Sequence, residues 1–156
     1  TQVKWFARQG GELYFIDGEN RLCSVYGTTA LYEAAESMGR KKPELVILEN
    51  VGNLVCPAEF DTGSDLNLVI LSVPEGDDKP LKYPLMFEKA DIVVINKMDS
   101  LPAFDFNLKK CETNIRFRNE KACIFPISAR TGEGISELAE KITEHVGERR
   151  AEGEEK

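Results

Sequence analysis

Two short loops in this sequence carry side chains suited to reading a nucleotide base. "NKMD", which runs from Asn96 to Asp99, follows the apolar stretch "DIVVI", and "SARTGEG", which starts at Ser128, follows "CIFPI". The Asp99 carboxylate can accept hydrogen bonds from the ring N–H and the exocyclic amine of guanine, a donor pair that adenine lacks. Asp99 is therefore predicted to select guanine.

The neighbours of Asp99 suit supporting roles in the same pocket. Asn96 can bond the far edge of the purine and tie the two loops together, and the methylene stem of Lys97 can lie along the ring face. The backbone N–H of Ala129 can bond the guanine carbonyl, and Ser128 is expected to contact the base together with it. A four-residue match also occurs by chance in solvated turns, so the prediction depends on the pairing of two such loops, each placed after a buried strand.

A third loop has an unusual composition for the end of a strand. "ENVGNLVCPAEFD", from Glu49 to Asp61, follows the β-branched stretch "ELVIL" and offers a carboxylate, a glycine and a cysteine locked to a proline. The other cysteines are scattered without CxxC spacing, and each is expected to be a small core residue more often than a ligand: Cys23, Cys111 and Cys123. The only histidine, His145, is expected to face solvent.

An alternation of strands and helices must position these loops. Hydrophobic patterning predicts strands at 12–17, 44–49, 66–73, 91–96 and 122–128. It predicts helices at 3–10, 28–39, 83–90, 104–119 and 134–146. Such an order implies right-handed crossovers and a three-layer α/β fold, with a mostly parallel sheet covered on both faces. Ligands of these sheets bind beyond the carboxyl ends of the strands, where the three loops lie.

Composition limits the class of protein. A net charge of -7 argues against binding to nucleic acid, and no apolar run approaches the roughly 20 residues of a membrane span. The N-terminus shows no signal-peptide pattern, so the cytoplasm is the expected location. We expect one partial domain over residues 1–147 and a disordered charged tail over residues 148–156.

Three stretches together resemble the HypB family, the GTPases that help to load nickel into nickel–iron hydrogenases. They are "LENVGNLVCPAEFDTG", "LSVPEGDDKPLKYPLMFEKADIVVINKMD" and "SARTGEG". The similarity runs from about Cys23 to the closing helix. It implies a G domain of the P-loop NTPase type, a homodimer, and as partners other hydrogenase maturation proteins and the hydrogenase large subunit.

The resemblance also implies roles for individual residues. Glu49 corresponds to the acidic residue near Mg²⁺ in GTPases, and Gly52 to the glycine whose N–H meets the terminal phosphate of GTP. Cys56 corresponds to a ligand of Ni²⁺ or Zn²⁺ at a subunit interface. Cys23 stands at about the spacing of the family's Cys-His pair, but the residue after it is Ser24, so this metal site lacks its imidazole.

The main departure from the family is in the phosphate-binding loop. No GxxxxGK[ST] stretch occurs in these residues, so the chain is expected to lack the P-loop portion of the G domain and to hydrolyse GTP poorly. Two alternatives stay open. One is a degenerate, non-catalytic G domain that serves as a metal-binding or dimerisation module, and the other is a urease-type nickel chaperone, which "NLVCPAEFD" disfavours.

Overall fold

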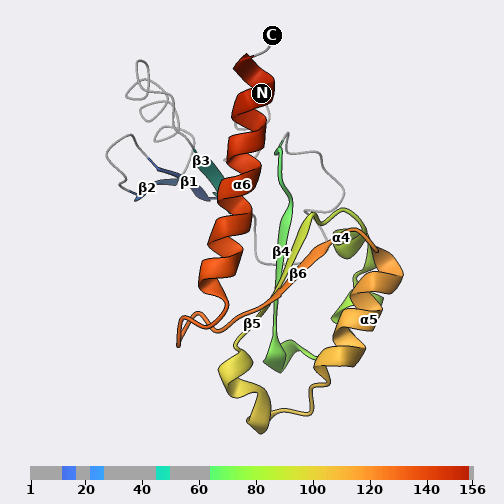
Figure 1. The fold of residues 1–156 in the computed structure, drawn as a ribbon. Helices are drawn as coiled ribbons and strands as arrows, with labels where there is room; N and C mark the ends of the chain where they lie inside the picture. Colours follow the sequence, from blue (N-terminus) through green and yellow to red (C-terminus); the bar gives the residue numbers. More distant parts are fainter. Residues whose placement is uncertain (1–11, 17–21, 27–44, 50–63, 155–156) are drawn as a thin grey trace. The chain divides into compact units, whose positions relative to one another are not determined.

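The structure is a computed structural model that describes residues 12–16, 22–26, 45–49 and 64–154 (Figure 1). The chain divides into two compact units, Thr1–Ser64 and Asp65–Lys156. The predicted helices at 3–10 and 28–39 lie outside the described residues, as do Gly52 and Cys56. Among the described helices, none combines the length and the apolar character needed to cross a bilayer.

The first unit contains an antiparallel sheet. Its strands are β1 (Glu12–Ile16), β2 (Leu22–Tyr26) and β3 (Leu45–Glu49), in the order β2-β1-β3, and both pairs are antiparallel. The sequence did not predict β2, and the parallel arrangement predicted for the whole chain does not extend to this sheet. For the pair of β1 and β2, the physical reason is the short connection at residues 17–21, because a parallel pair needs a crossover of roughly a dozen residues or more.

The second unit is the predicted α/β arrangement with a parallel sheet. Its strands are β4 (Leu68–Ser72), β5 (Ile92–Asn96) and β6 (Cys123–Pro126), in the order β4-β5-β6. Its α-helices are α3 (Lys79–Lys82), α4 (Pro84–Glu88), α5 (Leu108–Arg118) and α6 (Ile135–Glu154). Two 3₁₀ helices come shortly after strands: η2 (Val73–Glu75) after β4 and η3 (Met98–Ala103) after β5.

Strand β5 is the centre of this unit's core. Its apolar residues from Ile92 to Ile95 are at most 2% exposed, as expected for a strand covered on both faces. On one face, Leu138 and Ile142 of α6 pack against the cluster of Ile92, Val94 and Ile127. Helices α4 and α5 lie on the other side of the sheet (Figure 1). These helices contribute Phe87 and Ile115, both fully buried, so the three predicted layers are present.

Two helix boundaries differ from the sequence prediction. Helix α5 begins at Leu108 instead of residue 104, because Asn107 caps it by accepting the N–H of Lys110 at 3.0 Å. Helix α6 continues to Glu154, well into the segment that was expected to be a disordered tail from residue 148. That segment reads "ERRAEGE", which is rich in strong helix formers, so its charge does not prevent it from extending the helix.

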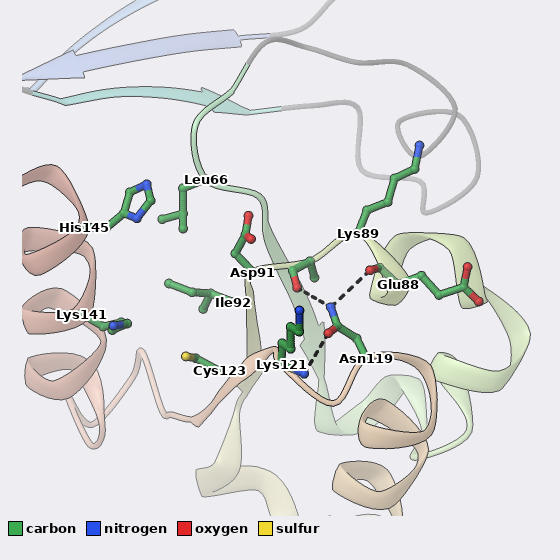
Figure 2. A pocket seen from close by; sticks show the side chains of 11 residues that line it. Leu66, Glu88, Lys89, Asp91, Ile92, Asn119, Lys121, Cys123, Lys141 and His145 are labelled. Atoms are coloured by element: carbon green, nitrogen blue, oxygen red, sulfur yellow. Dashed lines mark hydrogen bonds between the residues drawn. The ribbon is translucent and has the colours of Figure 1, made fainter. Parts of the chain in front are cut away.

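One amide side chain ties together three elements at the amino edge of the parallel sheet. The Asn119 Nδ2 group donates to backbone carbonyls at the end of α4, at 2.8–3.3 Å: those of Phe87, Glu88 and Ala90. Its Oδ1 atom accepts the N–H groups of Lys121 and Ala122, at 3.0 and 3.2 Å, just before β6 begins. Figure 2 shows this side chain between the end of α4 and the turn into β6.

The Asn119 side chain also lines a hollow of about 400 Å³ at the amino ends of β5 and β6 (Figure 2). His145 lines the same hollow and is half-buried, with a shielded Nε2 atom that has no hydrogen-bond partner in the described part of the chain. The expectation that His145 simply faces solvent is therefore wrong. This hollow lies at the opposite edge of the sheet from the loops that follow β5 and β6.

We predict that Asn119→Asp lowers the free energy of unfolding more than Asn119→Ala does. The carboxylate would place negative oxygens against three carbonyl oxygens, whereas alanine leaves room for water from the hollow. The expected loss for Asn119→Asp is about 1–3 kcal/mol, as for shielded polar groups deprived of their partner. Urea unfolding followed by circular dichroism measures it, and equal stability of the two variants would contradict the proposed tie.

Candidate functional site

The parallel pairing of β5 and β6 brings the two candidate base-reading loops to one edge of the sheet. Ile95 is opposite Pro126 in the register, so the loops that start at Asn96 and Ser128 leave the sheet side by side. Backbone hydrogen bonds continue past the strands: the N–H of Ile127 donates to Ile95 at 2.8 Å, and the N–H of Met98 donates to Ile127 at 3.1 Å. The two loops are thus fixed relative to each other.

The Asn96 side chain makes the tie that the sequence suggested. Its Oδ1 atom accepts the backbone N–H of Lys97 at 2.7 Å and that of Ala129 at 3.2 Å. The amide of Asn96 therefore bridges the loop after β5 and the loop after β6. The Ala129 N–H, which was predicted to bond the guanine carbonyl, is held by Asn96 in this structure.

The Asp99 carboxylate is oriented by a buried hydroxyl. Ser128 is fully buried, and its Oγ atom donates to Asp99 Oδ1 at 2.7 Å while accepting the N–H of Thr131 at 3.2 Å. The serine hydroxyl therefore fixes the orientation of the Asp99 carboxylate. The second oxygen, Oδ2, lies 3.8 Å from Nη1 of Arg130. Sequence reasoning passed over Arg130, although it is the cation of "SARTGEG" and follows Ala129 directly.

The loop after β6 has little conformational freedom. The Ser128 N–H donates to the carbonyl of Glu133 at 2.9 Å, and the Gly132 N–H donates to the carbonyl of Ser128 at 2.8 Å. Gly134 has a φ of +72°, and a Cβ atom there would come within 2.6 Å of the Pro126 carbonyl oxygen. Only glycine fits this position, which brings the loop back against the end of β6 before α6 begins.

Lys97 adopts a backbone conformation that most residues avoid. Its φ and ψ are 64° and 37°, and no other non-glycine residue among those described has a positive φ. The carbonyl of Lys97 accepts both the backbone N–H and the hydroxyl O–H of Ser100, at 2.9 and 2.6 Å. The lysine backbone is therefore held in the left-handed region by contacts on both sides, although glycine would adopt it with less strain.

The loop after β4 reaches the same edge and is anchored to α5. The side chain of Asp77 is only 12% exposed, and its carboxylate accepts the N–H of Asn107 at 3.1 Å and pairs with Lys110 at 2.9 Å. The hydrogen bond from the Lys110 ammonium to the Asp77 carboxylate raises the pKa of the lysine. Nearby, Lys79 pairs with Glu75 at 3.5 Å. This loop is "EGDDKPLKYP", one of the stretches on which the resemblance rests.

The residues predicted to hold magnesium and the transported metal belong to the first unit. Glu49 is the last residue of β3, and Cys23 lies within β2, opposite Phe15. The described residues contain no group of three or more His, Cys, Asp or Glu side chains placed to hold a metal. Cys111 is fully buried and is therefore a core residue. Its burial raises the pKa of its thiol to about 12, so the thiol stays protonated.

Comparisons with known proteins agree with this arrangement. Residues 20–126 match the family model "CobW/HypB/UreG, nucleotide-binding domain". The hydrogenase maturation factor HypB of Rhizobium leguminosarum bv. viciae is 49% identical over 102 residues, which cover 65% of this chain and 34% of that protein. The chain thus spans about a third of the length of this relative.

Two solved structures share the fold. The crystal structure of the hydrogenase maturation factor HypB from Archaeoglobus fulgidus has a TM-score of 0.67 and 32% identity, covering 76% of this chain and 57% of that one. The crystal structure of HypB from Helicobacter pylori in complex with nickel has a TM-score of 0.61 and 39% identity, covering 64% and 46%. These similarities confirm the resemblance and the fold class that the sequence predicted.

We predict that Lys97→Gly stabilises the fold whereas Lys97→Ala does not. Glycine relieves the left-handed strain, and the expected gain in the free energy of unfolding is about 1 kcal/mol. Alanine removes the same long side chain but keeps the Cβ atom that causes the strain, which makes it the matched control. Urea unfolding of the two variants measures the difference. A glycine variant no more stable than the alanine variant would show that this conformation is unstrained.

Proposed function

This chain belongs to the CobW/HypB/UreG family of nucleotide-binding domains, and we propose that it binds a guanine nucleotide as a HypB-type metallochaperone. In this role it assists the GTP-dependent insertion of nickel into nickel–iron hydrogenase. The observation that carries the proposal is the Asp99 carboxylate, which buried Ser128 orients at 2.7 Å between two loops tied by Asn96. The proposal keeps the cytoplasmic location predicted from the sequence.

The proposed base site selects guanine through the hydrogen-bond acceptors that Asp99 presents to the base. The carboxylate of Asp99 presents only acceptors, so a base with two adjacent donors satisfies it and a base without them leaves it unpaired. The Asp99 side chain is 21% exposed, so its hydrogen bonds to a base are partly shielded from water. A base that leaves the carboxylate unpaired therefore binds with a less favourable free energy. In this proposal Lys97 lies along the ring, and the N–H of Ala129 turns from Asn96 to the guanine carbonyl.

Glu49 and Gly52 keep the roles that the family resemblance implies. We propose that Glu49 lies near the Mg²⁺ that accompanies GTP or GDP, and that the N–H of Gly52 meets the terminal phosphate. A bound Mg²⁺ would offset the negative charge of the phosphates. The same loop continues to Cys56, so the state of the nucleotide could change the position of a metal-binding cysteine through one short segment.

Nickel is the cargo in this proposal, and Cys56 is its main ligand, with Cys23 as a second. A thiolate suits Ni²⁺ or Zn²⁺, and Pro57 would stiffen the loop that presents it. Two thiolates are too few for a closed tetrahedral site, so a two-fold homodimer would supply two copies of each. Other hydrogenase maturation proteins and the hydrogenase large subunit would exchange the metal with it.

We predict that Asp99→Asn weakens the binding of GDP by about 1–3 kcal/mol and reduces its preference over ADP, because the amide replaces an acceptor with a donor. Isothermal titration calorimetry measures both. Asp105→Asn, which removes a carboxylate from an exposed position in the same unit, is the matched control and should leave the affinity unchanged. Equal affinity of the unmodified chain for GDP and ADP would refute the guanine site.

We predict about one metal ion per dimer, bound through cysteines from both subunits. Cys56→Ala should abolish binding, whereas Cys123→Ala, which removes a half-buried thiol of the second unit, should leave it intact. Elemental analysis of the purified dimer, with nickel and with zinc, measures the stoichiometry. Cys23→Ala is the sharper test of the shared site. If it changes neither stoichiometry nor affinity, Cys23 is not a ligand.

A further inference from the structure

We propose that the hollow at the amino ends of β5 and β6 is a binding site for a small organic carboxylate with a short aliphatic chain. All the residues that line this hollow belong to the second unit. Its volume of about 400 Å³ is within the range of small-molecule sites. The hollow lies at the opposite edge of the parallel sheet from the candidate base site, so a ligand there would not compete with a nucleotide.

The inner wall of the hollow is apolar. Leu66 and Cys123 line it, and both pack against Ile92 at the start of β5. Ile92 is 2% exposed and belongs to the core, whereas Leu66 and Cys123 are half-buried and present apolar surface to the hollow. An aliphatic chain placed against this wall would remove apolar surface of both partners from water, which favours binding.

Two lysine side chains bring positive charge to the same hollow. Lys141 extends toward it from α6, and Lys121 reaches it from the turn before β6 (Figure 2). Lys121 is exposed and has no ion-pair partner in the described part of the chain. Lys141 pairs with Glu144 at 2.6 Å, but an ammonium has three N–H donors, so the lysine can also bind a ligand.

The His145 imidazole lines the hollow with a polar atom that its surroundings do not satisfy. Its Nε2 atom is shielded from water and lacks a hydrogen-bond partner among the residues that the structure describes. A shielded polar atom without a partner is unfavourable. Rotation of an imidazole about its Cβ–Cγ bond is soft, so the ring can turn Nε2 toward the hollow. An acceptor bound there would supply the missing hydrogen bond.

The acidic residues of the hollow leave these donors available to an anion. The side chains of Glu88 and Lys89 extend away from the other side chains that line it (Figure 2). The carboxylate of Asp91 accepts the backbone N–H of Asn67 through its Oδ2 atom, at 2.8 Å. Two ammonium groups therefore accompany one partly occupied carboxylate, and this balance favours an anionic ligand over a cation.

The available donors fit a carboxylate better than a phosphate. Phosphate sites commonly aim backbone N–H groups at the ligand. Around this hollow such groups are already bonded: Asp91 and Ile92 donate to the carbonyl of Asn67 at 2.9 and 3.2 Å, and Cys123 donates to that of Asp91 at 2.9 Å. The Asn119 Nδ2 group is occupied by three carbonyls. The remaining lysine and histidine donors suit two carboxylate oxygens, with the aliphatic part of the ligand on the apolar wall.

The test uses butyrate as the probe and His145 as the reporter, on the full chain. His145 is the only histidine in the sequence, so its ring gives one set of imidazole NMR signals. We expect butyrate to shift these signals in a saturable manner, whereas inorganic phosphate and n-butylammonium leave them unchanged at the same pH and ionic strength. Butyrate should also raise the midpoint of thermal unfolding, because it binds the folded chain and not the unfolded one.

A pair of lysine variants tests the position of the ligand. Lys121→Ala should weaken the binding of butyrate roughly three- to ten-fold, through the loss of one charge-assisted contact. Lys121 is exposed, so this variant should fold normally. Lys109→Ala, which removes one exposed cation from α5, is the matched control and should bind butyrate as the unmodified chain does.

Each contrary outcome refutes a stated part of the proposal. If butyrate causes no saturable shift, the hollow is not a carboxylate site. An equal response to phosphate would show that the aliphatic chain contributes nothing, and an equal response to n-butylammonium would show that the lysines do not select an anion. If Lys121→Ala and Lys109→Ala bind butyrate equally well, the ligand lies elsewhere on the chain.

Discussion

The parallel pairing of β5 with β6 is the constraint on which the candidate site depends. It brings the carboxyl ends of two strands to one edge, although a 3₁₀ helix and α5 separate them in the chain. Side chains then connect the two loops that the backbone brings together. Asn96 bridges the loops, and Ser128 reaches from the second loop to the carboxylate of the first. A site assembled this way needs both strands in register, so a slip of one residue would separate the donor from its acceptor.

Much of this arrangement could be predicted because it follows from apolar patterning. "DIVVI" and "CIFPI" are short apolar runs suited to a strand buried on both faces, and the polar loops follow directly, so their meeting at one edge needs only the parallel rule. The hidden position of Ser128 was not predictable in this way. The sequence predicts that Ser128 contacts the base, and its bond to the Asp99 carboxylate becomes visible only when the two loops are placed beside each other.

Other features depend on contacts that local sequence does not encode. The strand β2 contains a cysteine and a serine, and only its pairing with β1 makes it a strand. The multiple roles of Asn119 require the end of α4, which lies far away in the sequence. The left-handed backbone of Lys97 breaks the preference of its residue type, and such departures are expected where a position serves a ligand more than the fold.

The two edges of the parallel sheet have different roles: the amino edge stabilises the fold, and the carboxyl edge forms the candidate site. Substitutions at the two edges should therefore have different effects in a cell. Damage at the amino edge, where Asn119 joins α4 to β6, acts on the folded fraction and would appear as less protein, since proteolysis removes chains that open. Loss of the partly exposed Asp99 carboxylate at the carboxyl edge would instead leave abundance near normal and impair ligand binding. Measuring protein level and nucleotide binding together would therefore separate substitutions that act on the fold from those that act on the site.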